Sequence, residues 1–418
     1  MNRFIKTRGI VKFLILSLLF ESSLAYCFFD PIPKARDLEF FLGTVGPGTD
    51  VTTRFGHTML IVKNMSTGEE YSVSWGIFDP MLTKPMFFWQ FFMGTLQQSA
   101  QSYRSDFILK YYSEDQRSIL QNQINLSLDQ KKKLLRIVLS DLKRAPTTYS
   151  FLYKNCASAL RDIIHSVLPH VLSRQSPNKQ NKQAILSIRK HLLELVSESS
   201  FYSIFIDILM NSEVDLIDSA WSGMFLPERL YKVLLHTKQL SATGTVPTPV
   251  LGRTEILAKG NIVRSSPIKA FHAYLFLGLA FILILFFLRK HYPPYYKGLM
   301  IFFSCCFAFF SASIGLLMSL NWALSSFTLT LHNANLWLFW PTDFLFVFTF
   351  FFRGMSYRFL TLYTLVHLIT LLTFLTLYSS SYFTQEVSRI ALFLSPVSLA
   401  YFALILTAKR QWHGTEPV

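Results

Sequence analysis

The chain has 418 residues, of which 51% are hydrophobic and 16% aromatic, with 41 phenylalanines. These apolar residues gather mostly after residue 268, which divides the chain into a soluble part and a membrane part. The formal charge of +15 does not indicate nucleic-acid binding, because the soluble part has no basic patch interleaved with aromatic residues. Four cysteines, two of them adjacent in an apolar run, provide no disulfide framework.

Residues 1–25 have the pattern of a secretory signal peptide. A basic start precedes the apolar run 13–20, and small residues lead to a cleavage site after Ala25. Cys27 invites a lipoprotein interpretation, but Tyr26 stands where a lipobox requires Gly or Ala. The pattern therefore predicts that the segment after residue 25 is exported.

Two short segments predict a β-hairpin in the exported part. Residues 57–62 are apolar and β-branched, residues 71–75 alternate, and a turn around Asn64 and Gly68 separates them. His57 begins the first strand beside a glycine. This histidine is either a base or a group satisfied by its surroundings, and the strand pattern alone does not decide between them.

Cys156 is the cysteine of the long soluble part, and the residues after it have helical spacing, with apolar positions at 160, 163, 164 and 167. Asn155 is a suitable N-cap for this helix. The positive end of the helix dipole lowers the pKa of a thiol placed there. Cys156 is therefore either a nucleophile or a small buried apolar residue.

The remaining soluble part, 159–240, is helical in character, and residues 242–267 have the Gly, Thr and Pro content of a linker. The C-terminal part, 268–410, predicts five transmembrane helices. Lys and Arg gather after the first, third and fifth spans, so these ends are cytoplasmic and the segment before the first span is extracytoplasmic. The spans are 271–288, 298–319, 336–352, 359–378 and 390–407.

A polar stretch, 331–343, lies on the extracytoplasmic side at the start of the third span. It contains His332, Asn333 and Asn335, followed by Trp337. Polar side chains near a hydrocarbon boundary are costly unless they are paired or functional. The alternative is an interfacial loop with an aromatic belt.

Several short motifs, in this order, resemble the Lnb family of lipoprotein N-acyltransferases. In the membrane part, the polar stretch before Pro341 is similar to a polar motif of that family. The resemblance extends over nearly the whole chain. In the soluble part it rests on Arg54-Phe55-Gly56-His57-Thr58, Ser74-Trp75-Gly76-Ile77-Phe78-Asp79, Phe91 with Gly94-Thr95-Leu96, Gln123-Ile124-Asn125-Leu126-Ser127, Asn155-Cys156-Ala157-Ser158 with Arg161-Asp162, and Ser219-x-Trp221-x-x-Met224-Phe225-Leu226-Pro227.

The resemblance implies an α+β fold, with a circularly permuted papain-like (NlpC/P60-type) extracytoplasmic domain at 28–241 and an all-α membrane bundle of five transmembrane helices. It implies that the chain transfers an acyl chain from a membrane phospholipid to the α-amino group of a lipoprotein's diacylglyceryl-cysteine. Cys156 is then the nucleophile that forms a thioester, and His57 is the general base and acid.

Further roles follow from the same resemblance. Ser74 is expected to orient His57, although the family has Asn near this position, and Tyr71 and Ser72 are alternatives. Asn155 and Ala157 are expected to support the oxyanion site at the helix start. Further candidates bind lipid head groups at the membrane surface, namely His332, Asn333, Asn335 and Trp337.

The expected partners are phospholipid as donor and diacylated lipoproteins as acceptor, with no metal, cofactor or nucleic acid. The expected location is the bacterial inner membrane, with the catalytic domain in the periplasm. Two other functions fit the soluble fold class: a membrane-tethered cysteine peptidase or amidase acting on the cell wall, and a non-catalytic membrane sensor. Five spans with a polar extracytoplasmic mouth favour the acyltransferase, since a hydrolase needs only one anchor.

Overall fold

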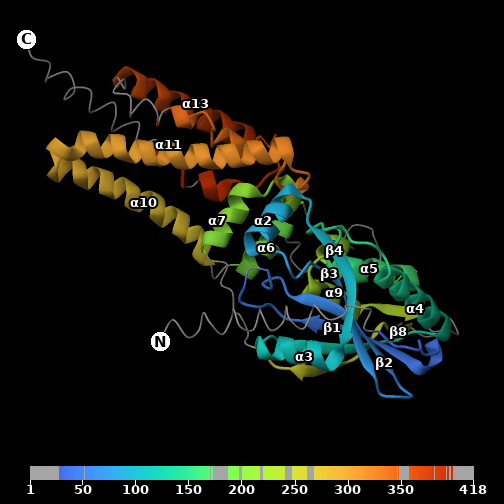
Figure 1. Cartoon of the computed structure of the whole chain (residues 1–418). Coiled ribbons are helices and arrows are strands. Elements are labelled where there is room, and N and C mark those ends of the chain that lie inside the picture. The colour runs from blue at the N-terminus through green and yellow to red at the C-terminus, as the bar shows by residue number, and fades with distance from the viewer. Residues whose placement is uncertain are drawn as a thin grey trace, which may run out of the picture. The chain divides into compact units, whose positions relative to one another are not determined.

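A computed structural model describes most of the chain, and its contacts divide the chain into two units (Figure 1). One unit comprises Met1–Ile185 with Asp218–Val263, and the other comprises Leu186–Ile217 with Arg264–Val418. The predicted signal peptide lies outside the described residues. These are 28–50, 52–169, 171–172, 187–196, 200–216, 220–240, 247–260, 268–345, 347, 357–380, 382–391, 393–394 and 397–398.

The N-terminal unit contains an antiparallel sheet with the strand order β6-β4-β3-β2-β1-β5-β9. The predicted hairpin is confirmed, because β2 and β3 pair antiparallel around the turn at Asn64 and Gly68. The strands are β1 (Leu38–Val45), β2 (His57–Asn64), β3 (Glu70–Ile77), β4 (Gln97–Arg104), β5 (Ile119–Ile124), β6 (Thr147–Thr148) and β9 (Leu251–Ala258), with a separate pair of β7 (Lys238–Leu240) and β8 (Pro247–Pro249).

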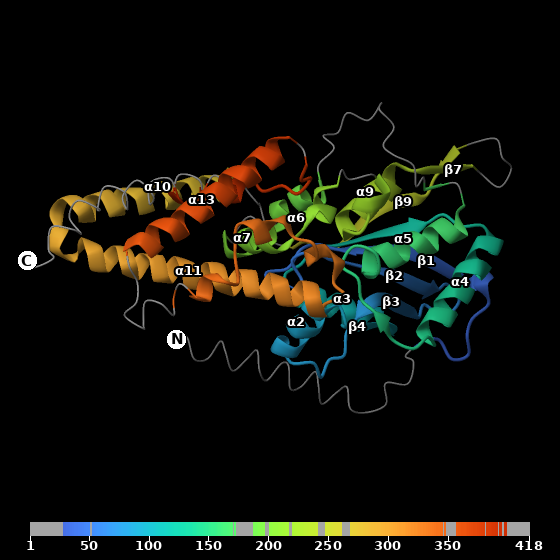
Figure 2. The ribbon, with the colours of Figure 1, turned by 90° about the horizontal axis from the view of Figure 1, so that it is seen from above.

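Helices cover both faces of this sheet. Side chains alternate between the faces of a strand, so Leu60 and Val62 join one core cluster while Met59 and Ile61 join another. Helices α4 and α5 lie along the first face (Figure 2), and α3 packs on the second. The helices of this unit are α2 (Lys84–Met93), α3 (Ser105–Glu114), α4 (Leu128–Leu142), α5 (Cys156–Val167), α8 (Ala220–Gly223) and α9 (Pro227–His236).

Burial on two faces explains why β1 and β2 are apolar almost throughout. Each fully buried Leu, Ile or Val side chain contributes about 1.5–3 kcal/mol relative to leaving it in water. Phe40 and Leu42 of β1 are fully buried, and they lie in the cluster formed with α4 and α5. The central strands are therefore rigid supports for the residues at their ends.

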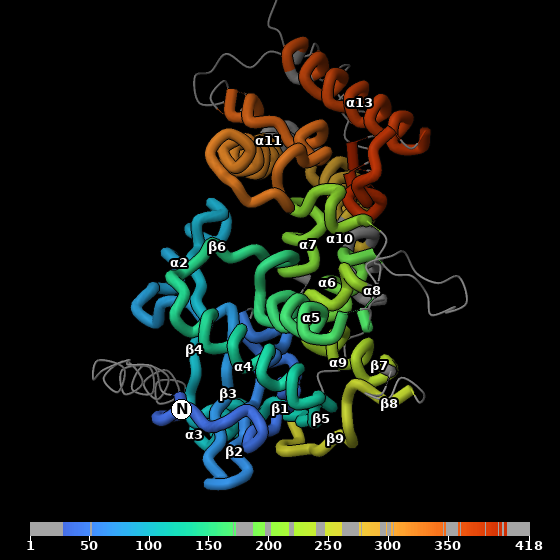
Figure 3. The backbone as a smooth tube through the Cα atoms, turned by 90° about the vertical axis from the view of Figure 1, so that its right-hand side faces the viewer, coloured from blue at the N-terminus to red at the C-terminus, as the bar shows by residue number. Residues whose placement is uncertain are grey.

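The segment expected to be a linker, 242–267, is partly sheet. Strand β9 pairs with β5 along most of its length, and the two lie side by side in Figure 3. Asn122 of β5 reinforces this pairing, because its amide donates to Gly252 O (3.1 Å) and to Thr254 Oγ1 (2.8 Å). The N-terminal unit therefore extends beyond the predicted boundary at 241.

The C-terminal unit is helical. Two of its helices, over 305–324 and 361–379, are long and apolar enough to cross a membrane among the residues that the structure describes. The described part of the predicted span 336–352 is not helical at its start, because a 3-10 turn that ends at Trp337 and further turns precede a helix that begins at Asp343. Most of the predicted span 390–407 lies outside the described residues. The helices are α6 (Ile188–Val196), α7 (Ser200–Leu209), α10 (Ile268–His291), α11 (Pro293–Leu324) and α13 (Tyr357–Ser379), with short 3-10 turns η2 (Ser212–Asp215), η3 (Thr328–Thr330) and η4 (Ala334–Trp337).

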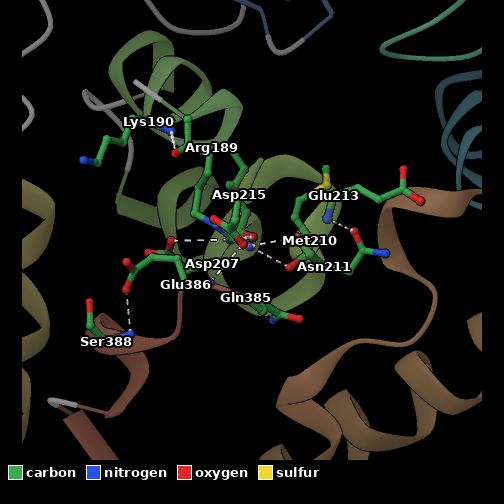
Figure 4. Close-up of polar contacts among 12 residues, drawn as sticks. Arg189, Lys190, Asp207, Met210, Asn211, Glu213, Asp215, Gln385, Glu386 and Ser388 are labelled. Atoms are coloured by element: carbon green, nitrogen blue, oxygen red, sulfur yellow. Dashed lines mark hydrogen bonds and ion pairs between the residues drawn. The ribbon is translucent and has the colours of Figure 1, made fainter. Parts of the chain in front are cut away.

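Helices α6 and α7 belong to this unit, although the sequence placed them in the catalytic domain. The buried guanidinium of Arg189 binds both carboxylate oxygens of Asp215 at 2.6 and 2.9 Å (Figure 4). Asp215 also accepts from the backbone N–H of Glu386, and Asp207 accepts from Arg389. A buried ion pair is tolerated only when its remaining hydrogen-bonding capacity is satisfied, and these contacts attach residues 186–217 to the C-terminal helices.

Candidate active site

His57 stands at the first position of β2, where the chain enters the sheet opposite Val45. The preceding Gly56 has φ of 79°, and a Cβ there would come within 2.8 Å of the Val45 carbonyl oxygen. Only glycine accepts both conditions without strain. The alternation of β2 places His57 on the same face as Met59 and Ile61, which is the face that α3 covers.

Ser74 of β3 is the hydrogen-bond partner of His57, with 3.1 Å between Nε2 and Oγ. Ser72, the alternative considered from the sequence, instead pairs with Ser105 Oγ at 2.8 Å. When Nε2 carries the imidazole hydrogen it donates to Ser74, and Nδ1 keeps its lone pair. The arrangement therefore leaves Nδ1 as the nitrogen able to accept a proton.

Cys156 is the first residue of α5, as predicted, and Asn155 is its N-cap. Asn155 Oδ1 accepts from the Ser158 backbone N–H, and Ser158 Oγ accepts from the Asn155 N–H, both at 2.8 Å. This reciprocal capping box satisfies two of the N–H groups that a helix start leaves free. The helix therefore begins at the cysteine.

The Asn155 side chain also ties the helix start to two loops. Its Nδ2 donates to the carbonyls of Phe151 (2.7 Å) and Phe225 (3.0 Å). One helical turn further, the Arg161 guanidinium donates to Trp221 O (3.1 Å) and lies 4.3 Å from the centre of the Trp221 ring. The motif around Cys156 and the motif at residues 219–227 thus contact each other in the folded chain.

Three backbone N–H groups lower the pKa of the Cys156 thiol, those of Thr58, Ala157 and Cys156 itself. Burial acts in the opposite direction and is the largest influence, so the thiol pKa is raised overall. The expected lowering at a helix start is therefore outweighed by desolvation. The Thr58 contact places the sulfur beside β2, one residue after His57.

Burial lowers the pKa of His57 to about 3, and the charge of Arg117 adds to this effect. The imidazole is therefore neutral at physiological pH. A neutral imidazole is suited to accepting a proton from a protonated thiol during attack, rather than to holding a resting ion pair. Cys156 itself keeps part of its surface in solvent.

A cleft of about 270 Å³ opens beside the start of α5. Its lining includes Trp75, Gly76, Gln98 and Lys154. A Cβ added to Gly76, which has φ of 76°, would lie 3.2 Å from the Cys156 backbone nitrogen. Gly76 therefore separates the cleft from the Cys156 backbone, and neither Cys156 nor His57 is among the residues that line the cleft. No group of three or more His, Cys, Asp or Glu side chains suited to a metal occurs among the described residues.

The polar stretch of the C-terminal unit departs from the expected role in lipid binding. Asn333 and Asn335 are buried, with 3% and 0% of their surface exposed. Their amides donate to the carbonyl of Ile208 at 2.9 Å, and Asn335 also donates to that of Asp207 at 3.0 Å. The last-turn carbonyls of a helix lack intrahelical partners, so these amides cap the C-terminus of α7.

The other two residues of that group lie nearer the surface. Trp337 is 43% exposed, and its ring lies 5.9 Å from that of Phe383. His332 has φ of 51°, and its ring lies 5.0 Å from that of Trp322. Trp337 therefore keeps an exposed surface, whereas the side chains of Asn333 and Asn335 are buried.

Sequence reasoning missed three residues near Cys156. Thr58 acts through its backbone, and no sequence pattern marks such a contact. The Arg117 guanidinium lies 4.9 Å from the centre of the Tyr112 ring, which lies 5.9 Å from the His57 ring. Both flank a turn between α3 and β5, where neither helical nor strand periodicity identifies a functional side chain.

The comparisons with known proteins agree with the motifs of the soluble part. Residues 32–180 match the family model described as the Lnb N-terminal periplasmic domain. Neither a curated protein nor a solved structure matches the chain. The matched segment contains His57, Ser74 and Cys156, whereas the motifs at 219–227 and 332–341 lie outside it. The resemblance found in the sequence is confirmed for the soluble part, where residues 32–180 match the Lnb N-terminal periplasmic domain.

Proposed function

We propose that this protein is a lipoprotein N-acyltransferase that uses Cys156 as its nucleophile. The observation that carries the proposal is the packing of α5, which begins at Cys156, on β2, which begins at His57; the N–H of Thr58 also lowers the pKa of the Cys156 thiol. This packing brings the start of α5 to the start of β2, next to His57, although the two segments are nearly 100 residues apart. Both segments lie within the matched Lnb domain.

The first half-reaction forms a thioester. As Cys156 Sγ attacks the ester carbonyl of a phospholipid, its proton passes to Nδ1 of His57. The N–H groups at the start of α5 stabilise the tetrahedral oxyanion. The ester C–O bond then breaks, the glycerol oxygen takes the proton from His57, and a lysophospholipid leaves.

The second half-reaction transfers the acyl chain. The α-amino group of a diacylglyceryl-cysteine attacks the thioester carbonyl, and His57 accepts a proton from that nitrogen. The C–S bond breaks, the sulfur regains the proton, and the lipoprotein carries an amide-linked acyl chain. Ser74 keeps the imidazole oriented through both halves, because its hydroxyl holds Nε2.

The same proposal includes a circularly permuted papain-like fold for the catalytic unit. A strand that begins with the base precedes the helix that begins with the nucleophile, which is the order expected for that permutation. We assign residues 28–185 and 218–260 to the catalytic unit in the periplasm. Residues 268–410 are assigned to five spans in the bacterial inner membrane, and two described helices have the required length and apolarity.

Mass spectrometry of a lipoprotein N-terminus, made with and without this protein, tests the activity. We expect an N-acyl group only in its presence, and Cys156→Ala and His57→Ala should lower acylation by at least about 10³-fold. Cys156→Ser should be nearly inactive, and Cys306→Ala is the matched control with full activity. Full acylation by Cys156→Ala would refute the proposal.

Two further measurements separate this function from a cell-wall hydrolase. Protein mixed with phospholipid but no acceptor should accumulate an acyl adduct on Cys156 that hydroxylamine removes. A soluble fragment lacking residues 186–217 and 268–418 should fold and lose acyl transfer, because the lipid substrates are in the membrane. Retained hydrolysis of peptidoglycan by that fragment would favour the hydrolase.

A further inference from the structure

Arg117 is a buried cation in the turn between α3 and β5. Only 3% of its surface is exposed. Its Nε donates to the carbonyl of Gly46 at 2.8 Å, while Nη2 is buried without a hydrogen-bond partner. Among the described residues, no carboxylate lies within ion-pair distance of this guanidinium.

Such an arrangement is costly for folding alone. A buried charge without a paired carboxylate loses hydration that one neutral hydrogen bond does not replace. The Tyr112 ring offsets part of this cost, with its centre 4.9 Å from the guanidinium carbon. Arg161, the comparable buried arginine of α5, has both a ring and the carboxylate of Asp162 at 2.9 Å.

The sheet register places Arg117 at the end of the sheet that carries the candidate active site. Ile119 of β5 pairs with Val45 of β1, and Val45 pairs with His57 of β2. Tyr112 lies between the guanidinium and His57, with ring centres 5.9 Å apart. The charge therefore sits two strands from His57, on the face of the sheet that α3 covers.

We propose that Arg117 is the fixed cation of this site, a positioning residue that stabilises negative charge on the Cys156 sulfur and on the tetrahedral oxyanion. This inference rests on the proposed function for the oxyanion, whereas the effect on the sulfur does not depend on the substrate. His57 does not provide this positive charge at rest, because burial keeps its imidazole neutral.

The charges around the sulfur agree with this role. The titratable and charged groups that act on Cys156 or feel its charge are Arg117, Tyr112 and Tyr149, and His57 lies beside them. Burial raises the pKa values of both tyrosines, so they are neutral. Burial is the largest influence on the pKa of the Cys156 thiol and raises it, while the charge of Arg117 acts in the opposite direction. Asp115 and Tyr111 in turn act on Arg117. Arg117 is thus the permanent charge acting on the thiolate.

Alkylation of Cys156 in the full-length protein, resolved by peptide mass spectrometry, tests the inference without any lipid substrate. Iodoacetamide is neutral and iodoacetate is anionic, so the ratio of their rates reports the local positive potential as well as the thiolate population. The variants are Arg117→Gln, which removes the charge, and Arg117→Lys, which keeps it. Arg161→Gln is the matched control, because it removes a buried arginine stacked on an aromatic ring.

In Arg117→Gln we expect the thiol pKa to rise, which lowers the thiolate fraction at pH 8. The higher basicity makes each thiolate more reactive and offsets part of this loss, so we expect alkylation by iodoacetamide to slow by about threefold. Iodoacetate should slow more, since its attraction to the site is also lost. Arg117→Lys should recover most of both rates, and Arg161→Gln should keep the wild-type rate ratio.

An unchanged ratio of the two rates in Arg117→Gln would overturn the inference, even if the variant were less stable. Equal slowing of both reagents is this same result, because it shows that no local positive potential was lost at the sulfur. Failure of the proposed function looks different: Cys156→Ala would then retain acyl transfer, while the alkylation ratio would still depend on Arg117.

Discussion

The depressed pKa of His57 predicts a specific acid sensitivity of the fold. Burial lowers this pKa from 6.5 to about 3, so the folded protein binds the imidazole proton less readily than the unfolded chain. The stability that this provides is fully present above pH 6.5 and is lost as the pH falls towards 3. Between pH 7.5 and 5.5 the loss is about 1.3 kcal/mol, because the unfolded chain becomes protonated while folded His57 stays neutral.

The magnitude at pH 5.5 holds for any folded pKa below about 4.5, since folded His57 is then almost unprotonated. For a unit of this size, 1 kcal/mol corresponds to about 2–4 °C in Tm. Thermal unfolding of the full-length protein in detergent should therefore show wild type losing roughly 3–5 °C more than His57→Gln over this pH range. The variant retains an amide that can still meet Ser74.

The matched control is His236→Gln, which removes an exposed histidine from α9 of the same unit. Its Tm should change with pH in parallel with wild type, because the carboxylates common to both proteins titrate alike. Equal pH dependence of wild type and His57→Gln would refute the argument. It would show that His57 takes up its proton in the folded protein as easily as in the unfolded chain.

Substitutions at three further positions probe other contacts. Gly76→Ala should cost about 1–3 kcal/mol, because alanine strains the positive φ and crowds the Cys156 nitrogen; an unchanged Tm would contradict this. Ser74→Ala should lower kcat more than it changes KM, whereas Ser74→Asn should restore turnover; a change in KM alone would indicate substrate contact instead. Asn335→Ala should destabilise the C-terminal unit by about 1–3 kcal/mol, measured by thermal unfolding, while alkylation of Cys156 stays at the wild-type rate.

The parts of the fold predicted from sequence are those determined by local pattern. The hairpin of β2 and β3 follows from alternation across a short turn, and the start of α5 follows from an N-cap before helical spacing. Strand β9 was missed, because its partner β5 lies about 130 positions earlier and its own sequence contains linker-like residues. Membership of α6 and α7 in the C-terminal unit depends on the contacts of Asp215 with Glu386 and of Asp207 with Arg389, which sequence spacing does not reveal.

The candidate site shows the same division. Cys156, Asn155 and His57 were identified because each begins an element and matches a motif. Arg117 could not be predicted from the sequence, because a single arginine in a turn has no periodicity. Its proposed importance comes from its burial without a carboxylate partner, which only the structure shows. Asn333 and Asn335 were interpreted as lipid ligands because polar residues at an apolar boundary have two uses, and only the contacts with α7 distinguish capping from ligand binding.

The return of the chain to the sheet after α7 has a consequence for biosynthesis. Residues 186–217 leave the ribosome long before the segment that completes their unit, since Asp215 accepts from the N–H of Glu386, 171 positions later. Domains generally fold as units during synthesis. Here the sheet adds its edge strand β9 while α6 and α7 still lack their C-terminal contacts. A chain that terminates before Glu386 therefore has a complete N-terminal sheet, whereas its α6–α7 segment still lacks the Glu386 N–H that Asp215 accepts and the Arg389 guanidinium that Asp207 accepts.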